Sequence, residues 1–554
     1  MPPAAGSLIR RLMRPSVNAG CSAGRAPFIV VWSGMAMPCA DLLIIGGGSS
    51  GASLAYEAVR RGLKVTLLEA EDPAVGTSSR STKLLHGGVR YLELAVKKAD
   101  PAQFKLVREA LVERGHWIRQ APFLAHTLNL VLPTEGLIER SYYRLGLGFY
   151  DLLAGSAGLG TTSSLNAEGV QRTFPGLDRR FNGGVRYSDG QFNDARLNLL
   201  LLLTAAQAGL EVVRDCRVVG FERADGRLSA AISEGPGGEQ QRWHARVIVN
   251  ATGIAADQLR LLADPDAEAR LLVSRGTHLV LRGNLCAGGD GLLIPRTSDG
   301  RVLFLLPFFG RTLLGTTDIP CPAAEATQVS DQERTYLLEH LARWFPDCTT
   351  AEVGSSWAGG RPLIRAAGSS ASSSRLVREH EVEQLPSGLI SLLGGKWTTC
   401  RVLALDALQL VLARLGSSEP AAKPLPLLGS AADSDQTMTQ LLALRPRLQQ
   451  QLLDHPQRDA QVDHLIASYG LRAEEVIHHA RQPAELEPLS EVLPICRAEW
   501  RFNIAQEWAT TSSDLLSRRS RLALLDQQET TRLSSMASEL LEESGSTSPI
   551  NHQQ

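Results

Sequence analysis

The chain has 554 residues, of which 44% are hydrophobic and 21% are charged, and its formal net charge is -1. This length and composition predict an ordinary globular protein of two to four domains with buried cores. A nearly neutral chain gives no electrostatic basis for binding nucleic acid, so that class of partner is excluded.

The eight cysteines are scattered along the chain without a Cys-x-x-Cys pair. This spacing argues against a zinc site, an iron–sulfur cluster or a disulfide framework, and it favours a reducing compartment. We therefore predict no metal site. No apolar run reaches the roughly 18–20 residues that span a bilayer, so any membrane attachment is expected to be peripheral.

Residues 1–39 form an N-terminal extension that contains arginines but no acidic residue. An arginine-rich, acid-free segment is typical of an organellar transit peptide. The alternative is a start codon placed too early, since Met35 or Met37 would begin the protein just before the first predicted strand. We favour the second interpretation, and organellar targeting stays open.

The first structural unit, residues 41–69, has the order strand, glycine turn, helix, strand and acid. In the turn, Gly46 permits a tight bend, Gly48 lets a pyrophosphate approach the backbone, and Gly51 lets the helix pack close to the sheet. The N-terminus of the helix offers unpaired N–H groups to phosphates. Glu69 follows about 20 residues later, where a carboxylate can bind the ribose hydroxyls. The unit therefore predicts a dinucleotide-binding fold.

The next segment separates a flavin from a nicotinamide dinucleotide, because it is a loop rich in hydroxyl groups rather than a second crossover helix. The hydroxyls are those of Thr77, Ser78, Ser79, Ser81 and Thr82. Small donors of this kind suit a pyrophosphate and a ribitol chain, and the glycine pair that follows lets the backbone approach a flat ring. The cofactor contacts expected in this loop are Thr77, Ser78, Ser79, Ser81, Gly87 and Gly88.

Periodicity predicts the remaining elements in chain order. Residues 103–120 form an amphipathic helix, and the rest of 94–190 is expected to be rich in loops. A helix at 194–208 and a strand at 247–250 return to the dinucleotide-binding part, whereas residues 270–320 alternate as an antiparallel sheet. After these come a third cofactor-binding part at 385–412, a linker at 413–430, a helical domain at 431–526 and a flexible polar tail at 527–554.

Several motifs follow one another along the chain. They are TSSRSTKLLHGGVRYLE from Thr77, YSDGQFNDARLN from Tyr187, NATG from Asn250, GTH from Gly276, GTTD from Gly315, WAGGRPL from Trp357, GGKWTTCR from Gly394 and SDLLSRRSRL from Ser513. In this order the motifs resemble those of the respiratory, FAD-dependent glycerol-3-phosphate dehydrogenases. The resemblance extends over about residues 40–526.

The resemblance implies an α/β fold in which a glutathione-reductase-type FAD-binding domain carries an inserted β-rich substrate domain and is followed by an all-helical cap. The oxidoreductase domain would be residues 40–412. Its FAD-binding parts would be about 40–93, 194–253 and 385–412, and its substrate parts about 94–193 and 254–384.

The resemblance also implies which residues form the site. His278 would be the general base, Arg361 would bind a phosphate or oxyanion, and Lys396 would stabilise the reduced flavin. A lone histidine on a strand is more often structural, and only the resemblance favours the catalytic role. The other implied contacts are Arg90, Tyr91 and Arg378 for the substrate, and Lys83, His86, Ala251, Gly253, Gly394, Gly395 and Thr398 for FAD.

The implied activity is the oxidation of sn-glycerol 3-phosphate to dihydroxyacetone phosphate, with FAD as cofactor and a quinone as electron acceptor. The enzyme would be cytoplasmic and attached peripherally to the inner membrane, and a homodimer stays open. The alternatives are an oxidase that reduces O₂ and a non-catalytic FAD-binding protein. The number of arginines suits a phosphate and disfavours an amine substrate.

The arginines near the C-terminus allow two interpretations. Arg518, Arg519 and Arg521 follow Asp514 at helical spacing, so they form ion pairs on a helix face or contact anionic lipid headgroups. We favour the ion pairs.

Overall fold

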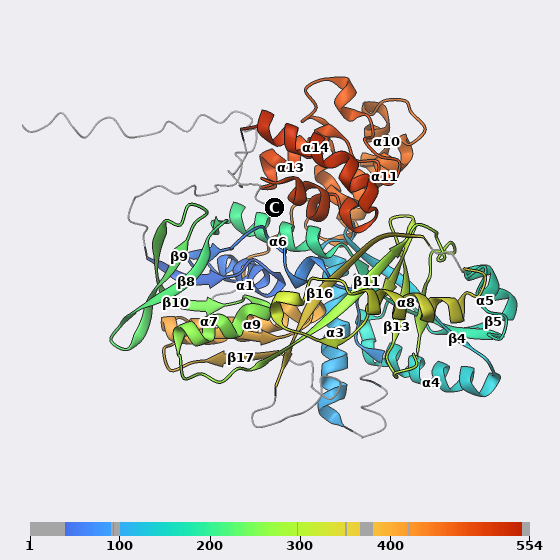
Figure 1. The fold of residues 1–554 in the computed structure, drawn as a ribbon, viewed down its shortest axis with the longest axis horizontal. Helices are drawn as coiled ribbons and strands as arrows, with labels where there is room; N and C mark the ends of the chain where they lie inside the picture. The colour runs from blue at the N-terminus through green and yellow to red at the C-terminus, as the bar shows by residue number, and fades with distance from the viewer. Residues whose placement is uncertain are drawn as a thin grey trace, which may run out of the picture.

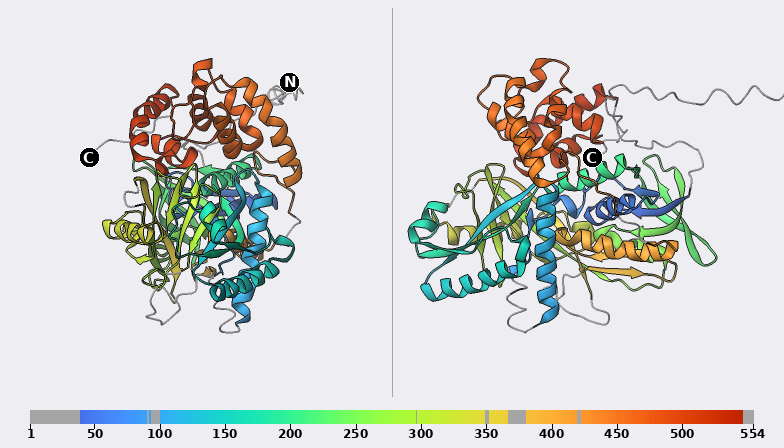
Figure 2. Two further views of the ribbon diagram at one scale, coloured as in Figure 1. Left: turned by 90° about the vertical axis from the view of Figure 1, so that its right-hand side faces the viewer. Right: turned by 180° about the vertical axis from the view of Figure 1, so that it is seen from behind.

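The computed structural model describes residues 39–89, 92, 100–295, 297–348, 352–365, 380–418 and 422–545. Two β-sheets lie beside each other, and the C-terminal helices lie together over one side of them (Figure 1). Figure 2 shows this arrangement from the side and from behind. The predicted α/β fold with a helical cap is confirmed.

The first sheet has a parallel centre, with strands in the order β18, β10, β1, β2 and β7. β17 pairs antiparallel with β18 at one edge, and β8 and β9 form an antiparallel ribbon with the first half of β10. The strands are β1 (Ala40–Ile45), β2 (Val65–Leu68), β7 (Glu211–Val213), β8 (Arg217–Ala224), β9 (Arg227–Glu234), β10 (Gln240–Asn250), β17 (His380–Gln384) and β18 (Ile390–Gly394).

Both faces of this sheet are covered, which explains why its strands are continuously apolar. Leu42 and Ile44 face α1 (Ser49–Arg60), α6 (Asp194–Gln207) and α9 (Cys400–Leu415), whereas Leu43 and Ile45 face the side of the ribbon. The leucines of α6 are buried on every side. The reason is that α6 lies between the sheet and the C-terminal helices (Figure 1).

The second sheet has the strand order β15, β11, β14, β13, β12, β4, β6 and β3, with β16 paired to β11 and β5 paired to β6. Its strands are β3 (Leu84–Leu85), β4 (Ala125–Thr134), β5 (Ser163–Asn166), β6 (Gly183–Phe192), β11 (Leu271–Leu281), β12 (Gly291–Ile294), β13 (Leu303–Phe308), β14 (Arg311–Gly315), β15 (Ile319–Pro320) and β16 (Val353–Ile364). The helices associated with the two sheets are α3 (Pro101–Gln120), α4 (Leu137–Ala154), α5 (Ala167–Thr173), α7 (Ala256–Ala263) and α8 (Asp331–Trp344).

The prediction that residues 94–190 are rich in loops after the first helix was wrong. β4 and β6 pair from Ala125↔Phe192 to Thr134↔Gly183, and α4 follows β4 directly. The second half of β4, from Leu130 to Thr134, is buried at every position, so it lacks the alternation that marks a half-exposed strand.

The C-terminal domain consists of α10 (Ser434–Gln451), α11 (Arg458–Tyr469), α12 (Ala473–Ile477), α13 (Arg497–Gln506) and α14 (Gln527–Glu543). The tail expected from residue 527 onward is therefore a helix as far as Glu543. Asp526 caps α14 by accepting from the N–H groups of Gln528 and Glu529, and Leu533 and Leu540 bury one face. The other face is polar, which is why composition alone indicated a tail.

The lipid alternative for the C-terminal arginines was wrong, because Arg518, Arg519 and Arg521 are 7%, 1% and 1% exposed. Arg518 and Arg519 form ion pairs with Asp72, and Arg521 pairs with Asp194 at 3.0 Å. The favoured ion pairs exist, and they join the helical domain to the cofactor domain.

Candidate active site

A cavity of about 1450 Å³ extends from the carboxyl ends of β1, β10 and β18 to the second sheet. Thirteen of the predicted cofactor residues line it: Gly46, Gly48, Glu69, Thr77, Ser78, Ser81, His86, Gly88, Ala251, Gly253, Gly394, Gly395 and Thr398. The three predicted catalytic residues, His278, Arg361 and Lys396, line the same cavity. The predicted cofactor and substrate regions are therefore continuous.

The glycine turn after β1 fits a dinucleotide because its backbone leaves no room for side chains. A Cβ on Gly51 would lie 1.9 Å from the carbonyl oxygen of Gly46, so only glycine lets α1 approach the strand. Gly46 has a φ of +106°, and a Cβ there would lie 2.8 Å from the carbonyl oxygen of Ala251. These contacts leave the N-terminus of α1, at Ser49 and Ser50, open to the cavity.

Glu69 lines the cavity and also holds the turn. One carboxylate oxygen accepts from the N–H of Gly47 at 2.6 Å, and the other accepts from the N–H of Glu71 at 3.0 Å. Burial raises the pKa of Glu69, and the two backbone hydrogen bonds oppose that shift. From the other side, the amide of Asn198 donates to the carbonyl of Gly47 at 2.8 Å.

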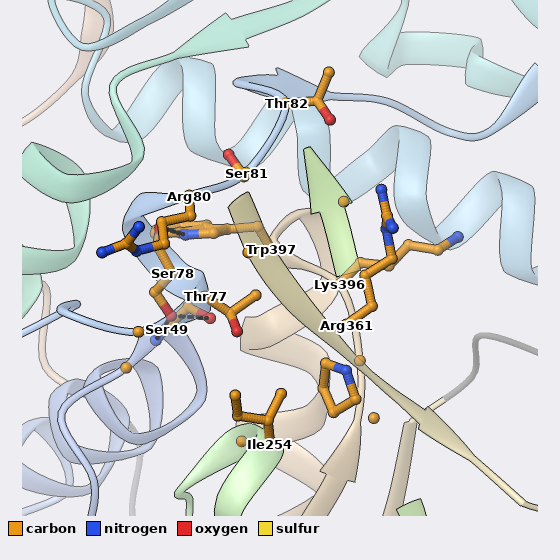
Figure 3. Close-up of a pocket in the computed structure, with 18 of the residues that line it drawn as sticks. Ser49, Thr77, Ser78, Arg80, Ser81, Thr82, Ile254, Arg361, Lys396 and Trp397 are labelled. Carbon is orange, nitrogen blue, oxygen red and sulfur yellow. Dashed lines mark hydrogen bonds between the residues drawn. The ribbon is translucent and has the colours of Figure 1, made fainter. Parts of the chain in front are cut away.

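The hydroxyl-rich loop is anchored at several points. The hydroxyl of Thr77 donates to the carbonyl of Gly360 at 2.6 Å, and the hydroxyl of Ser78 accepts from the N–H of Ser49 at 2.9 Å. Trp397 covers the loop and donates to the carbonyl of Ser78 at 2.9 Å. Figure 3 shows Thr77 and Ser78 beside Ser49 on one side of the cavity and Arg361 and Lys396 together on another.

Four predicted cofactor residues do not line the cavity. Gly51 acts through packing, as described above. Gly87 donates to the hydroxyl of Tyr150 at 2.7 Å, and a Cβ there would lie 2.8 Å from Leu111. The carbonyl of Ser79 binds the ammonium of Lys83 at 2.8 Å.

Lys83 is fully buried and its ammonium lies 2.6 Å from a carboxylate oxygen of Asp194. It also lies 4.4 Å from the centre of the Trp357 ring. Its position in the motif suggested a cofactor contact, but the carboxylate behind the loop holds it away from the cavity. Lys83 therefore shapes the loop.

The second sheet brings His278 and Arg361 to the cavity on neighbouring strands, β11 and β16. The guanidinium of Arg361 donates to the hydroxyl of Thr316 at 3.0 Å and to Asp318 at 3.2 Å. It lies over Gly276, where a Cβ would be 2.4 Å from a guanidinium nitrogen. The GTH motif therefore has its glycine because the arginine occupies the space above it.

His278 is 2% exposed, and its ring stacks on Trp357 at a centroid distance of 4.1 Å. Burial, together with the charges of Lys83 and Arg361, lowers the pKa of His278 well below its usual range. The imidazole is therefore neutral near pH 7, as a general base must be.

Lys396 follows β18 and precedes α9, so the end of a central strand positions it at the cavity. The predicted substrate residues Arg90, Tyr91 and Arg378 lie outside the described residues. Among the described residues, no group of three or more His, Cys, Asp or Glu side chains could hold a metal ion. Likewise, no described helix has the length and apolarity needed to cross a membrane.

Sequence reasoning overlooked several residues that shape the site. Asp194 and Asn198 belong to the quoted YSDGQFNDARLN motif, and their polar side chains on a buried helix were the available signal. Trp397 and Thr316 also lie within quoted motifs. Thr82 was counted among the loop hydroxyls, but its partner on β11 is distant in sequence and gave no signal.

Comparisons with known proteins agree with this geometry. Residues 41–399 match the family described as FAD dependent oxidoreductase, and residues 421–548 match the C-terminal domain of alpha-glycerophosphate oxidase. A mitochondrial glycerol-3-phosphate dehydrogenase from Arabidopsis thaliana is 34% identical over 97% of this chain and 88% of the relative. The chain belongs to the FAD-dependent glycerol-3-phosphate dehydrogenase family.

Other members of the family are similar over comparable lengths. The mitochondrial glycerol-3-phosphate dehydrogenase of Homo sapiens is 36% identical over 88% of this chain and 68% of the relative. The solved structure of the glycerol-3-phosphate dehydrogenase from Bacillus halodurans, complexed with FAD, has a TM-score of 0.69 at 25% identity. It covers 93% of this chain and 97% of that chain, so the cap is part of the shared fold.

Proposed function

We propose that this protein oxidises sn-glycerol 3-phosphate to dihydroxyacetone phosphate with FAD and passes the electrons to a quinone. The observation that carries the proposal is the convergence of His278, Arg361 and Lys396 on one cavity with the dinucleotide-binding turn. When bound, FAD supplies the hydride acceptor. The retention of all three residues argues against a flavoprotein without catalytic activity.

Each of the three side chains has a role that fits its surroundings. The neutral imidazole of His278 accepts the proton of the substrate hydroxyl. Arg361 binds the phosphate or the developing oxyanion, because its planar guanidinium can donate two parallel hydrogen bonds. Lys396 lines the same cavity and would stabilise the negative charge that develops on the flavin when it is reduced.

Anaerobic bleaching of the flavin absorbance tests the substrate assignment. Glycerol 3-phosphate should bleach the bound flavin, whereas glycerol, which lacks the phosphate, and a 2-amino acid should not. Bleaching by the amino acid alone would contradict the proposal. Oxygen uptake without added quinone, at a rate matching substrate oxidation, would instead identify an oxidase.

We further propose that helix α4 attaches the protein to the membrane that contains the quinone. Its apolar side chains Ile138, Tyr142, Leu145, Phe149 and Leu152 recur at helical spacing, and their exposed fractions are 89%, 54%, 79%, 36% and 73%. A continuous exposed apolar stripe of this kind is typical of a helix that lies in the membrane interface. The opposite face of α4 packs against the protein through Leu147 and Tyr150.

The proposed location is the surface of an inner membrane, and the compartment depends on residues 1–39. The relatives are named as mitochondrial enzymes, and this supports organellar targeting by residues 1–39. A cytoplasmic location would follow if translation starts at Met35 or Met37. Determining the N-terminal residue of the native protein, together with cell fractionation, distinguishes the two.

A further inference from the structure

The hydroxyl of Thr82 lies within hydrogen-bond distance of the imidazole of His278 in the wall of the cavity. Thr82 comes from the loop after β2 and His278 from β11, and the distance from Oγ1 to Nε2 is 3.0 Å. Both residues line the cavity. His278 is 2% exposed, whereas Thr82 is partly exposed, so the hydroxyl is the more accessible member of the pair.

The imidazole is confined in this position by its neighbours. Trp357 stacks on one face with an interplanar angle of 19°. The backbone of Gly315 lies against the Cδ2–Nε2 edge, since a Cβ there would be 2.4 Å from Cδ2. The ring therefore lies between Trp357 and the backbone of Gly315, with Nε2 beside Thr82.

The loop that carries Thr82 is equally constrained, because the residues on both sides of it bind the carboxylate of Asp194. The N–H and hydroxyl of Ser81 donate to Asp194 at 3.1 and 2.7 Å, and the ammonium of Lys83 lies 2.6 Å from it. Arg521 of the helical domain donates to the same carboxylate at 3.0 Å. The loop segment that places the Thr82 hydroxyl beside Nε2 is therefore held on both sides.

We propose that Thr82 is a catalytic residue whose hydroxyl transfers the proton of the substrate to His278. The O–H bond at C2 of the substrate breaks and its proton binds Oγ of Thr82, while the hydroxyl proton of Thr82 passes to Nε2. The electron pair of the C2–H bond leaves as hydride to the flavin, and the carbonyl forms. The step requires a resting imidazole that carries its hydrogen on Nδ1.

The charges around the pair allow the base to be regenerated. Lys83 and Arg361 disfavour the imidazolium that each turnover produces. The same cations therefore promote loss of the proton once the product has left. This inference rests on the proposed oxidation of glycerol 3-phosphate.

The test compares Thr82→Val, which keeps the shape but lacks the hydroxyl, with Thr82→Ser, which keeps the hydroxyl. At saturating glycerol 3-phosphate, anaerobic flavin bleaching should slow at least about 100-fold in Thr82→Val and stay within about 10-fold of wild type in Thr82→Ser. FAD content and the affinity for dihydroxyacetone phosphate, measured from the change in flavin absorbance, should be unchanged in both variants.

A second readout follows the protons directly. In mixtures of H₂O and D₂O, the wild-type bleaching rate should depend on the deuterium fraction along a curve, because two protons move together. A linear dependence would mean that one proton moves, and it would overturn the relay.

Three other results would also overturn the proposal: Thr82→Val bleaching as fast as wild type, Thr82→Ser as slow as Thr82→Val, or a loss of product affinity that matches the loss of rate. If wild type itself is not bleached by glycerol 3-phosphate, the proposed function fails and the relay fails with it. Failure of the relay alone leaves wild-type bleaching intact.

Discussion

Arg361 stands at the cavity wall with its guanidinium oriented by two side chains, Thr316 and Asp318. Its side chain is 22% exposed and that of Asp318 is 18% exposed, so a substrate can reach the arginine without breaking a fully buried ion pair. The carboxylate and the hydroxyl therefore orient the guanidinium where it lines the cavity.

Replacing Arg361 with alanine should therefore reduce turnover far more than it affects folding. Removing one positioned donor of this kind costs about 10²- to 10³-fold in rate. Arg361→Lys should recover only part of the loss, since an ammonium cannot form two parallel hydrogen bonds. The measurement is the anaerobic bleaching rate at low substrate, with FAD content as the control. If Arg361→Ala bleaches at a near-normal rate, Arg361 does not bind the substrate.

The low pKa of His278 predicts an unusual pH dependence. Because its pKa in the folded protein lies well below 6.5, the base stays neutral at pH 6.5, where an exposed histidine would be half protonated. The bleaching rate at saturating substrate should therefore remain on its plateau below pH 6.5. An acid limb with a midpoint at or above pH 6.5 would contradict this assignment.

The same residue lowers stability in acid. Below pH 6.5 the unfolded state binds a proton at His278 that the folded state excludes, so the free energy of unfolding falls as the pH decreases. The burial of His278 thus affects the pH dependence of both the bleaching rate and the free energy of unfolding.

Single residues were predicted from sequence where the backbone itself dictates the residue type. Gly51 could be predicted because α1 must approach the strand, and Arg361 because glycines and a proline surround it. The ammonium of Lys83 binds Asp194 and does not line the cavity, and a sequence position does not reveal which way such a side chain points. Thr82 was not singled out, because its importance depends on β11 lying beside the loop.

At the scale of elements, α4 and α14 show what periodicity missed. α4 has apolar residues at helical spacing, but Gly146 and Gly148 lie inside it and are poor helix formers, so the sequence analysis did not predict a helix there. α14 was hidden by its polar composition. In the first sheet, β1, β2 and the end of β10 were predicted because each is a short, strongly apolar run, whereas β7 and β17 were not predicted.

α6 is joined to the helical domain by a buried ion pair between Arg196 and Glu507. Both side chains are 0% exposed, and two guanidinium nitrogens bind the two carboxylate oxygens. Three residues of α6 make these contacts. Asp194 binds the hydroxyl-rich loop, Asn198 binds the glycine turn, and Arg196 forms the ion pair with Glu507. The helix therefore connects the cofactor site with the cap.

Glu507→Ala should destabilise the protein by about 3–5 kcal/mol, because it leaves a fully buried guanidinium without its partner. Urea unfolding of the holoenzyme measures the effect. Arg445→Ala is the control, since its pair with Asp463 is 38% and 61% exposed and is worth about 1 kcal/mol or less. The double variant Arg196→Met, Glu507→Leu should regain most of the loss. Equal effects of Glu507→Ala and Arg445→Ala would contradict the argument.

At the scale of the whole molecule, the helical domain and α4 lie on opposite sides of the two sheets (Figures 1 and 2). The arginines of the helical domain are directed inward to Asp72 and Asp194, which fixes the loops that line the cavity. The arginines are therefore not available to lipid, whereas α4 exposes apolar side chains that can contact a membrane. The fold class followed from the order of motifs, whereas the packing of domains depends on ion pairs that the sequence does not reveal.

The membrane proposal predicts that Ile138→Glu and Leu145→Glu, combined in one variant, weaken binding to liposomes about 10- to 100-fold or more, because two exposed apolar side chains no longer enter the interface. Liposome co-sedimentation measures the binding. Detergent should release the wild type more readily than high salt, since the contact is mainly apolar.

Leu442→Glu is the matched control, because Leu442 of α10 is also 70% exposed but lies on the helical domain. It should bind liposomes like wild type. Bleaching by glycerol 3-phosphate in solution should be unchanged in all of these variants, since none of the altered residues lines the cavity. If the α4 variant sediments with liposomes as well as wild type does, the lipid contact lies elsewhere, and the exposed stripe of α4 has another partner.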